Sequence, residues 1–237
     1  MGIPLVASER HDHGGRPLEI LHYPDRSLIL LGGIPGAGKS TLLNRLYGLT
    51  GSETDTVRTG GGVRVVDSQQ SRNRLTPWLR RLPYPAWRWV VHVLHYLRVA
   101  TALRSGDPVI VHETGTRRIV RVLLGTYCRL VGVPVHLVLI DADPWEARRG
   151  QIARGRMVTS RSFRTHERRW RRLIGACTRG PGRAMPGARS LVVLDRRRAG
   201  RLGGIRFGGS GAPVPQGPAL RVLTCPGLYG AALLAPL

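Results

Sequence analysis

The sequence predicts an α/β fold of three layers, in which a five-stranded, mainly parallel sheet lies between helices on both of its faces. Three observations support this prediction. Short, continuously apolar segments alternate along the chain with longer segments of helical periodicity. A strand followed by a helix and a second strand favours a right-handed crossover and parallel pairing. The apolar segments show no polar–apolar alternation, as expected of parallel strands that are covered on both faces.

The five expected strands are short and end in polar residues or glycine. Residues 27–32 form the first strand, which a pair of glycines stops. The other four are expected at residues 63–66, 109–111, 135–140 and 191–194. Because parallel strands end at the same edge of a sheet, the polar residues that follow them should converge on one crevice. These residues are Gly33, Asp67, Glu113 and Asp141.

Helices are expected between the strands. Residues 40–49 carry leucines at helical spacing, and Gly51 follows them. Residues 52–62 are polar and rich in glycine, which predicts a loop. The remaining helices are expected at residues 75–82, 87–104, 117–131, 144–154 and 162–177.

The 237 residues, of which 42% are hydrophobic, are enough for one substantial domain with a full core. Residues 1–26 are expected to be an extended lead-in, without the charged start and apolar block of a secretory signal. Residues 27–202 are expected to form the folded domain. Residues 203–237 are rich in glycine, proline and alanine and show little periodicity, which predicts a poorly ordered tail.

The formal net charge is +23, and most of it lies in the C-terminal part of the chain. Residues 1–146 carry +6, whereas residues 147–237 carry +17. Two interpretations stay open. Either the basic part holds phosphates or nucleic acid, or it is a solvated surface of a chain with an arginine-rich composition.

No run of about 18 apolar residues is present, which excludes a helical membrane span. The three cysteines (Cys128, Cys177 and Cys225) lie far apart and form no C-x-x-C pair. This pattern disfavours a disulfide framework and a thiolate zinc site, and it predicts a protein of the reducing cytoplasm.

The chemistry is predicted by the segment that follows the first strand, which matches G-x-x-x-x-G-K-[ST] in full and precedes a helix. Glycines let the backbone N–H groups surround a phosphate, and the start of the helix adds a positive dipole. Lys39 is the only lysine in the chain and is expected to contact the β- and γ-phosphates, while the Ser40 hydroxyl is offered to Mg²⁺. The expected nucleotide-binding residues are Gly33, Ile34, Pro35, Gly36, Ala37, Gly38, Lys39, Ser40 and Thr41.

The motif GIPGAGKST resembles the P-loop of the small kinase-like NTPases, which include polynucleotide kinase, gluconate kinase, zeta toxin and chloramphenicol phosphotransferase and are often labelled AAA-family ATPases. The resemblance extends over about residues 27–195, and its specific part is the P-loop. It implies a P-loop NTPase fold, binding of ATP and Mg²⁺, and transfer of the γ-phosphate. Nothing in the chain resembles the sensor or arginine-finger regions of hexameric AAA+ machines.

The resemblance also implies roles for residues beyond the P-loop. Asp67 would orient or deprotonate the acceptor hydroxyl, and Arg72 or Arg74 would hold the acceptor. An alternative for Asp67 is that it caps the next helix. Glu113 would contact Mg²⁺, although it is offset by one residue and His112 stands in the expected place.

Arginines are expected to cover the nucleotide. By resemblance, about residues 148–165 would form a mobile lid, in which Arg154 and Arg156 approach the γ-phosphate and act in catalysis. Arg148 or Arg149 could replace them, and all are alternatively surface residues. Arg196, after the last strand, would stack on the adenine.

Other candidates for metal binding are weaker. Asp141 and Asp143 are rivals of Glu113, although Asp143 precedes a proline and is typical of a helix start. His92 and His95 lie three residues apart on a helix, without an acidic or cysteine partner nearby, and are expected to be packing or surface residues.

Two functions compete at this point. The first is an ATP-dependent phosphotransferase that acts on an acceptor hydroxyl, either of a small molecule or of a nucleic-acid end. The second is an ATP-hydrolysing switch or binding module whose arginine-rich part binds nucleic acid. Against the second, aromatic residues are only 5% of the chain and leave few platforms for stacking bases. A structural protein with a vestigial P-loop is disfavoured by the intact motif.

Overall fold

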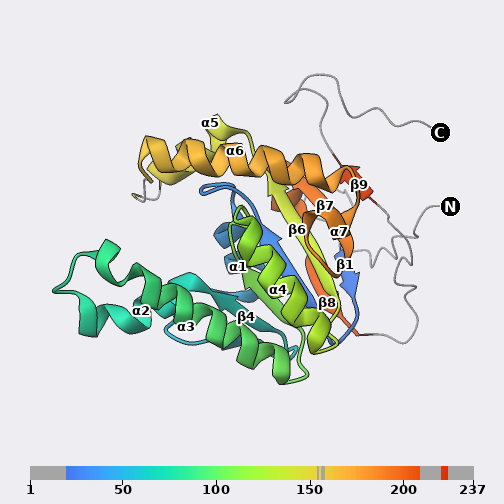
Figure 1. Ribbon diagram of the computed structural model, residues 1–237, viewed down its shortest axis with the longest axis horizontal. Coiled ribbons are helices and arrows are strands. Elements are labelled where there is room, and N and C mark those ends of the chain that lie inside the picture. The colour runs from blue at the N-terminus through green and yellow to red at the C-terminus, as the bar shows by residue number, and fades with distance from the viewer. Residues whose placement is uncertain (1–19, 154, 156–157, 209–219, 224–237) are drawn as a thin grey trace.

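The computed structural model describes residues 20–153, 155, 158–208 and 220–223. A seven-stranded sheet forms the centre of the molecule (Figure 1). All neighbouring strands pair in parallel except β3 and β4, which are antiparallel. In spatial order the strands are β3 (Val57–Arg58), β4 (Arg64–Asp67), β5 (Val109–His112), β2 (Leu28–Gly32), β6 (Val135–Asp141), β7 (Ala188–Asp195) and β9 (Leu220–Leu223).

The five predicted strands are present as β2, β4, β5, β6 and β7. The prediction of a five-stranded sheet misses the two edge strands. β3 has only two residues and lies in the segment expected to be a loop, and β9 lies in the glycine- and proline-rich tail. Neither is a continuous apolar run, because an edge strand is paired on one side only and need not be buried on both faces.

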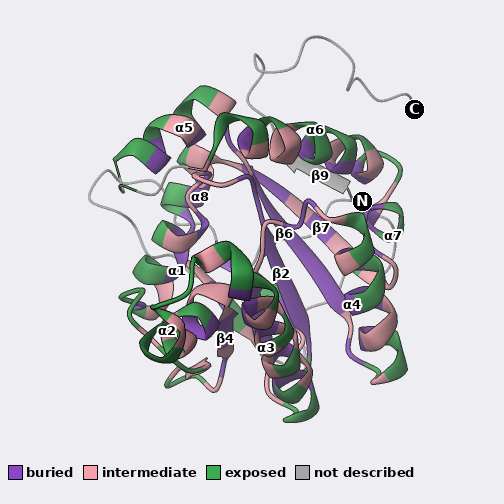
Figure 2. Ribbon diagram, turned by 60° about the vertical axis from the view of Figure 1, so that its left-hand side comes forward, coloured by how far each residue is buried: buried purple, intermediate pink, exposed green. Residues whose placement is uncertain are grey.

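Helices cover both faces of the sheet, so that the central strands are almost completely buried (Figure 2). On one side, α1 and α8 are joined by a hydrogen bond from Arg45 Nη2 to the carbonyl oxygen of Ala199, at 3.0 Å. The helices are α1 (Lys39–Tyr47), α2 (Ser68–Leu79), α3 (Tyr84–Arg104), α4 (Arg118–Leu130), α5 (Pro144–Ile152), α6 (Ser160–Cys177), α7 (Pro181–Ala184) and α8 (Arg196–Arg201).

Helix α2 begins at Ser68, seven residues before the predicted start. Asp67 and Gln70 form a capping box: Asp67 Oδ1 accepts from the N–H of Gln69 at 2.9 Å, and Gln70 Oε1 accepts from the N–H of Asp67 at 3.0 Å. Together they satisfy N–H groups that have no partner inside the helix. The capping alternative for Asp67 is thus confirmed, and it places the start of α2 directly at the end of β4.

A second, two-stranded parallel sheet pairs β1 (Ile20–Tyr23) with β8 (Gly204–Phe207). Ile20, Leu21 and Ile205 are buried in it. β1 lies in the expected extended lead-in, and β8 lies in the expected poorly ordered tail. Ile20–Tyr23 and Gly204–Phe207 are therefore paired strands where the sequence indicates irregular chain, because each strand depends on a partner that is distant in the sequence. The division at residues 27 and 202 stays a prediction.

The cysteines Cys128 and Cys177 are buried and free of disulfides. Cys225 lies outside the described residues. Within the residues that the structure describes, no helix is long and apolar enough to cross a membrane.

Candidate functional site

The P-loop connects β2 to α1 and turns through two glycines in the left-handed region, Gly36 with φ 89° and Gly38 with φ 108°. At Gly36 the space also requires glycine. A Cβ on this residue would lie 2.0 Å from the carbonyl oxygen of Ala147 in α5. Gln151, also in α5, donates from Nε2 to the carbonyl oxygen of Pro35 at 2.9 Å. Helix α5 therefore holds the outer side of the loop in place.

Lys39 is the first residue of α1 and is buried, with 6% of its surface exposed. Its Nζ donates to the carbonyl oxygens of Gly33 at 2.6 Å and Ile34 at 3.2 Å. The ammonium group is thus held across the loop, at the position where the motif requires a positive charge for phosphates. Ser40 is half-buried behind it, and Thr41 is exposed.

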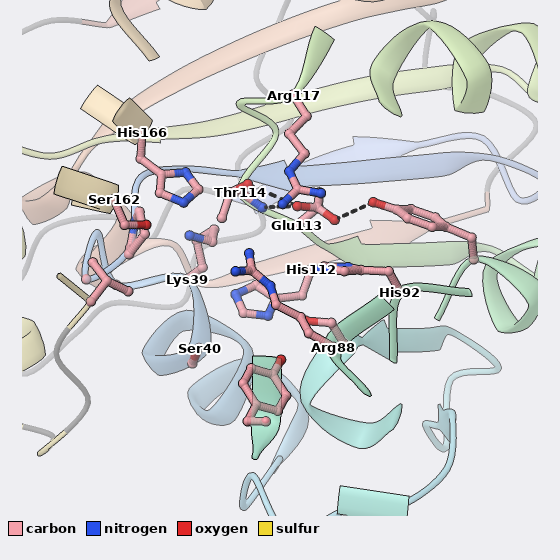
Figure 3. Close-up of a pocket in the computed structure, with 17 residues that line it drawn as sticks. Lys39, Ser40, Arg88, His92, His112, Glu113, Thr114, Arg117, Ser162 and His166 are labelled. Atoms are coloured by element: carbon pink, nitrogen blue, oxygen red, sulfur yellow. Dashed lines mark hydrogen bonds between the residues drawn. The ribbon is translucent and has the colours of Figure 1, made fainter. Parts of the chain in front are cut away.

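A cavity of about 400 Å³ opens beside Lys39 (Figure 3). The P-loop and the start of α1 form one wall, and α3 and the segment after β5 form another. Helix α6 contributes Ser162 and His166. This is the volume of a small-molecule site. Of the four residues whose convergence was predicted from the sequence, Glu113 lines this cavity, whereas Gly33, Asp67 and Asp141 do not.

Asp67, at the end of β4, lies directly beside His112, at the end of β5. Its Oδ2 is 2.6 Å from His112 Nδ1, and each side chain is only 16% exposed. Burial alone would raise the pKa of Asp67, but the charge and hydrogen bond of His112 outweigh it and lower the pKa to about 2. Asp67 itself does not line the cavity, whereas His112 does. The Asp67 carboxylate therefore reaches the cavity only through the imidazole.

Glu113 follows His112 and lines the cavity. Its Oε2 accepts from the hydroxyl of Tyr96 at 2.8 Å, and its Oε1 accepts from the N–H of Thr114 at 2.8 Å and from the Thr114 hydroxyl at 3.0 Å (dashed lines in Figure 3). Burial acts to raise the pKa of Glu113, but His95 and these hydrogen bonds outweigh it, so that the pKa is lowered. Glu113 is therefore a carboxylate held in a fixed orientation at the wall of the cavity.

Several cavity residues were not predicted as site residues from the sequence, among them Arg88 and His92 on α3, Arg117 before α4, and His166 on α6. His166 Nδ1 lies 3.0 Å from the Thr116 hydroxyl. Burial, followed by the charges of Arg117 and Lys39, lowers the pKa of His166 to about 4. Histidine spacing on α3 was visible in the sequence, but no sequence pattern indicates that these residues share a cavity.

The remaining predicted residues lie around this cavity or apart from it. Arg72 stacks on the ring of Tyr84, with its Cζ 4.5 Å from the ring centroid, and Tyr84 lines the cavity. Arg74 does not line it and instead pairs with Asp55 at 2.7 Å. Arg196 donates from Nη1 to the carbonyl oxygen of Glu146 at 2.8 Å, close to the P-loop side of α5.

The predicted lid is described only in part. Arg154 and Arg156 lie outside the described residues. Arg148 donates from Nη2 to the Ser160 hydroxyl at 2.6 Å, which links α5 to α6. Val158 and Ser162, from the same segment, line the cavity.

Two of the weaker metal candidates have other partners. Asp141 accepts a hydrogen bond from Trp170 Nε1 at 2.7 Å, and Asp143 caps α5 through the N–H groups of Trp145 and Glu146. In the described ranges, no group of three or more histidine, cysteine, aspartate and glutamate side chains could hold a metal ion.

A family model described as "AAA domain" matches residues 28–179, which include every residue that lines the cavity. The chain belongs to this AAA domain family. The family match and the intact P-loop identify the AAA domain as a P-loop NTPase, in agreement with the resemblance seen in the motif. A search of curated proteins gives no match.

Solved structures similar to this AAA domain include one from the PezAT chromosomal toxin–antitoxin system of Streptococcus pneumoniae, with 19% identity and a TM-score of 0.43. That match covers 64% of this chain and 56% of the other, so the chain spans just over half the length of that relative. The tunicamycin resistance protein of Deinococcus radiodurans is 18% identical over 74% of this chain and 92% of its own, with a TM-score of 0.43. A gluconokinase from Sinorhizobium meliloti is 13% identical over 76% and 89%, with a TM-score of 0.38.

Proposed function

We propose that this AAA domain protein is an ATP- and Mg²⁺-dependent phosphotransferase that moves the γ-phosphate of ATP to the hydroxyl of an acceptor. One observation carries the proposal. Lys39 of the P-loop lines the same cavity of about 400 Å³ as His112, which Asp67 holds from behind. A phosphate-binding group and a group that can take a proton thus face one space large enough for a small molecule.

The nucleotide is proposed to bind with its β- and γ-phosphates in the P-loop. Lys39 would exchange its hydrogen bonds to Gly33 and Ile34 for the phosphate oxygens, and the loop N–H groups would add further donors. Arg196 lies beside α5 and is proposed to face the adenine. Phosphoryl transfer depends mainly on such positioning and charge stabilisation.

The donor set fits a magnesium ion, because Ser40 and Glu113 line the cavity and provide the oxygen atoms that Mg²⁺ prefers. Bound there, the ion would neutralise charge on the phosphates. Glu113 is kept ionised and oriented by Tyr96 and Thr114. Few protein ligands are needed, because Mg²⁺ in such sites keeps several waters and takes other oxygens from the nucleotide.

The acceptor hydroxyl is proposed to meet His112 Nε2. This atom is buried and has no hydrogen-bond partner in the described part of the chain. Because the Asp67 carboxylate can only accept, it holds the proton of the neutral imidazole on Nδ1, and in this neutral form Nε2 is able to accept a proton. Asp67 thereby acts on the acceptor through His112, which refines the direct role that the sequence analysis assigned to it.

The predicted lid would exclude water from the transfer. Val158 and Ser162 already line the cavity. Arg154 and Arg156 are proposed to approach the γ-phosphate when the lid closes over the nucleotide. A guanidinium there would stabilise the charge that develops during transfer.

Labelled nucleotide tests the proposal. The protein is incubated with [γ-³²P]ATP, Mg²⁺ and separate pools of nucleosides, sugars, sugar phosphates, antibiotics and 5′-hydroxyl oligonucleotides. We expect label on an acceptor with the wild-type protein and none with Lys39→Ala. Release of label only as inorganic phosphate, at the same rate with and without every pool, would contradict a phosphotransferase.

A nucleotide-switched binding module is the second candidate, and one observation favours it. Arg161, Arg164 and Arg168 are exposed on α6 and line a shallow surface pocket together. Binding of an oligonucleotide is measured at increasing salt. A steep loss of affinity with salt, combined with ATP hydrolysis but no transfer of label, would favour this candidate over the first.

A further inference from the structure

We infer that the acceptor is a small, hydroxyl-bearing anion whose phosphate or carboxylate group is held by Arg88 and Arg117. The inference rests on the proposed phosphotransferase activity and names the class of substrate for the same cavity. Arg88 comes from α3, and Arg117 directly precedes α4. Figure 3 shows both guanidinium groups pointing into the cavity, on the side of His112 and Glu113.

Neither guanidinium group has a hydrogen bond or an ion pair within the residues that the structure describes. Most acids of the described chain are already engaged elsewhere. Asp107 pairs with two arginines, Asp55 pairs with two more, and Glu167 pairs with Arg171. Arg117 is nevertheless half-buried. A guanidinium withdrawn from water without a partner is unfavourable, so an anionic ligand would gain a charge-assisted contact there.

The charges of both arginines act on other groups of the cavity. Burial lowers the pKa of His92, and the charge of Arg117 lowers it further, with a smaller contribution from Arg88. The pKa of His166 is lowered by burial and then by Arg117 and Lys39, with Arg88 again contributing. The positive field of the two guanidinium groups therefore reaches opposite walls of the cavity.

The lining side chains have an excess of positive charge. Lys39, Arg88 and Arg117 are cationic, and Glu113 is the one carboxylate among the residues that line the cavity. The P-loop ammonium, together with the loop N–H groups and magnesium, serves the nucleotide phosphates. Arg88 and Arg117 come from other elements and are left for a second anion.

Uncharged polar atoms complete the acceptor site. Both ring nitrogens of His92 and the Nε2 of His112 are buried and lack a hydrogen-bond partner among the described residues. A neutral imidazole offers one donor and one acceptor, which suits hydroxyl groups. The volume of about 400 Å³ fits a small molecule and has no room for a folded partner. Hydroxyls near the histidines and an anionic group at the arginines together define the ligand.

Calorimetry with three matched probes tests the inference. The P-loop is first saturated with Mg²⁺ and a non-hydrolysable ATP analogue, and ribose, ribose 5-phosphate and ribonate are then titrated separately. We expect the anions to bind with millimolar or lower Kd and ribose to bind at least about tenfold more weakly. A comparison of ribose 5-phosphate with ribonate distinguishes a phosphate from a carboxylate.

Two double variants provide the comparison. Arg88→Gln with Arg117→Gln should weaken binding of the anions by on the order of tenfold or more and leave the affinity for the ATP analogue within about threefold of wild type. Arg81→Gln with Arg118→Gln removes two exposed arginines, one from the turn before α3 and one from the first residue of α4, with no lining residue changed. This control should bind the anions like wild type. Thermal unfolding confirms that both variants are folded.

Three results would overturn the inference while leaving ATP binding intact: no heat from either anion at 10 mM, equal affinity for ribose and the anions, or loss of analogue affinity instead of anion affinity in the Arg88 and Arg117 variant. Transfer of label to neutral acceptors alone would also overturn it while supporting a phosphotransferase. Failure of the analogue itself to bind would instead refute the proposed function on which the inference rests.

Discussion

The contact between Asp67 and His112 can be altered without removing the cap of α2. Asparagine caps helices as well as aspartate does, so Asp67→Asn should keep the hydrogen bond from the N–H of Gln69. To accept that bond, the asparagine side chain must place its amide oxygen at the Oδ1 position. Its NH₂ group then faces His112 Nδ1. The imidazole must then accept at Nδ1 and carry its proton on Nε2. The substitution thus reverses the tautomer and removes the charge.

The effect on stability follows from the lowered pKa. Asp67 has a pKa of about 2 in the fold and an ordinary value of 3.8. A carboxylate whose pKa is lowered by folding stabilises the protein at pH values above its pKa in the unfolded chain. This contribution is lost as the pH falls through its pKa in the fold. The difference corresponds to about 2 kcal/mol. We therefore expect Asp67→Asn to lower the free energy of unfolding by about 2 kcal/mol at pH 7, with the difference closing between pH 4 and pH 2.

Two assays measure these effects. Chemical denaturation between pH 2 and pH 7 gives the stability difference. Long-range ¹H–¹⁵N correlation spectra report which nitrogen of His112 carries the proton, and we expect Nδ1 in the wild type and Nε2 in Asp67→Asn. The transfer rate to an identified acceptor should fall by on the order of a hundredfold, with ATP affinity unchanged. An unchanged tautomer, or transfer within about threefold of wild type, would refute the role given to this pair.

Three further predictions concern the P-loop and the buried thiols. Lys39→Ala should abolish the heat of ATP binding in the presence of Mg²⁺. ATP binding equal to that of the wild type would show that Lys39 does not contribute to the nucleotide site. Gly36→Ala should lower the free energy of unfolding, measured by urea denaturation, by about 2–4 kcal/mol, because its Cβ would lie 2.0 Å from the carbonyl oxygen of Ala147 and its φ is positive. A loss below about 0.5 kcal/mol would show that the loop and α5 separate easily. Burial raises the pKa of the Cys128 and Cys177 thiols to about 12. Neither thiol should therefore react with a disulfide reagent at pH 8 until the protein is unfolded, and peptide mapping after labelling measures this.

Features with a local cause were predictable from the sequence. The P-loop and the strand before it are adjacent in the chain, and the conformation of both depends on residues within that one segment. The start of α2 was predictable but missed, because Asp67 and Gln70 have the spacing of a capping box and lie directly before the helix. The helix predicted from the sequence began only at residue 75.

Features that depend on distant partners were not predictable. Arg88, Arg117 and His166 belong to three different segments, and only the packing of α3, α4 and α6 around the sheet brings them to one cavity. Arg74 illustrates the converse. It lies on α2, which begins next to Asp67, but it forms an ion pair with Asp55 from the preceding loop. In an arginine-rich chain, the sequence cannot show which arginines are paired.

The pairing of β1 with β8 has a consequence for the order in which the protein is made. Ile20 lies opposite Gly204, so nearly the whole described chain separates the two partners. A ribosome adds roughly 5–20 residues per second from the N-terminus, which leaves β1 without its neighbour for about 10 seconds or longer. During translation the first of the described strands to emerge is therefore among the last to pair, and its buried side chains stay accessible to chaperones until then.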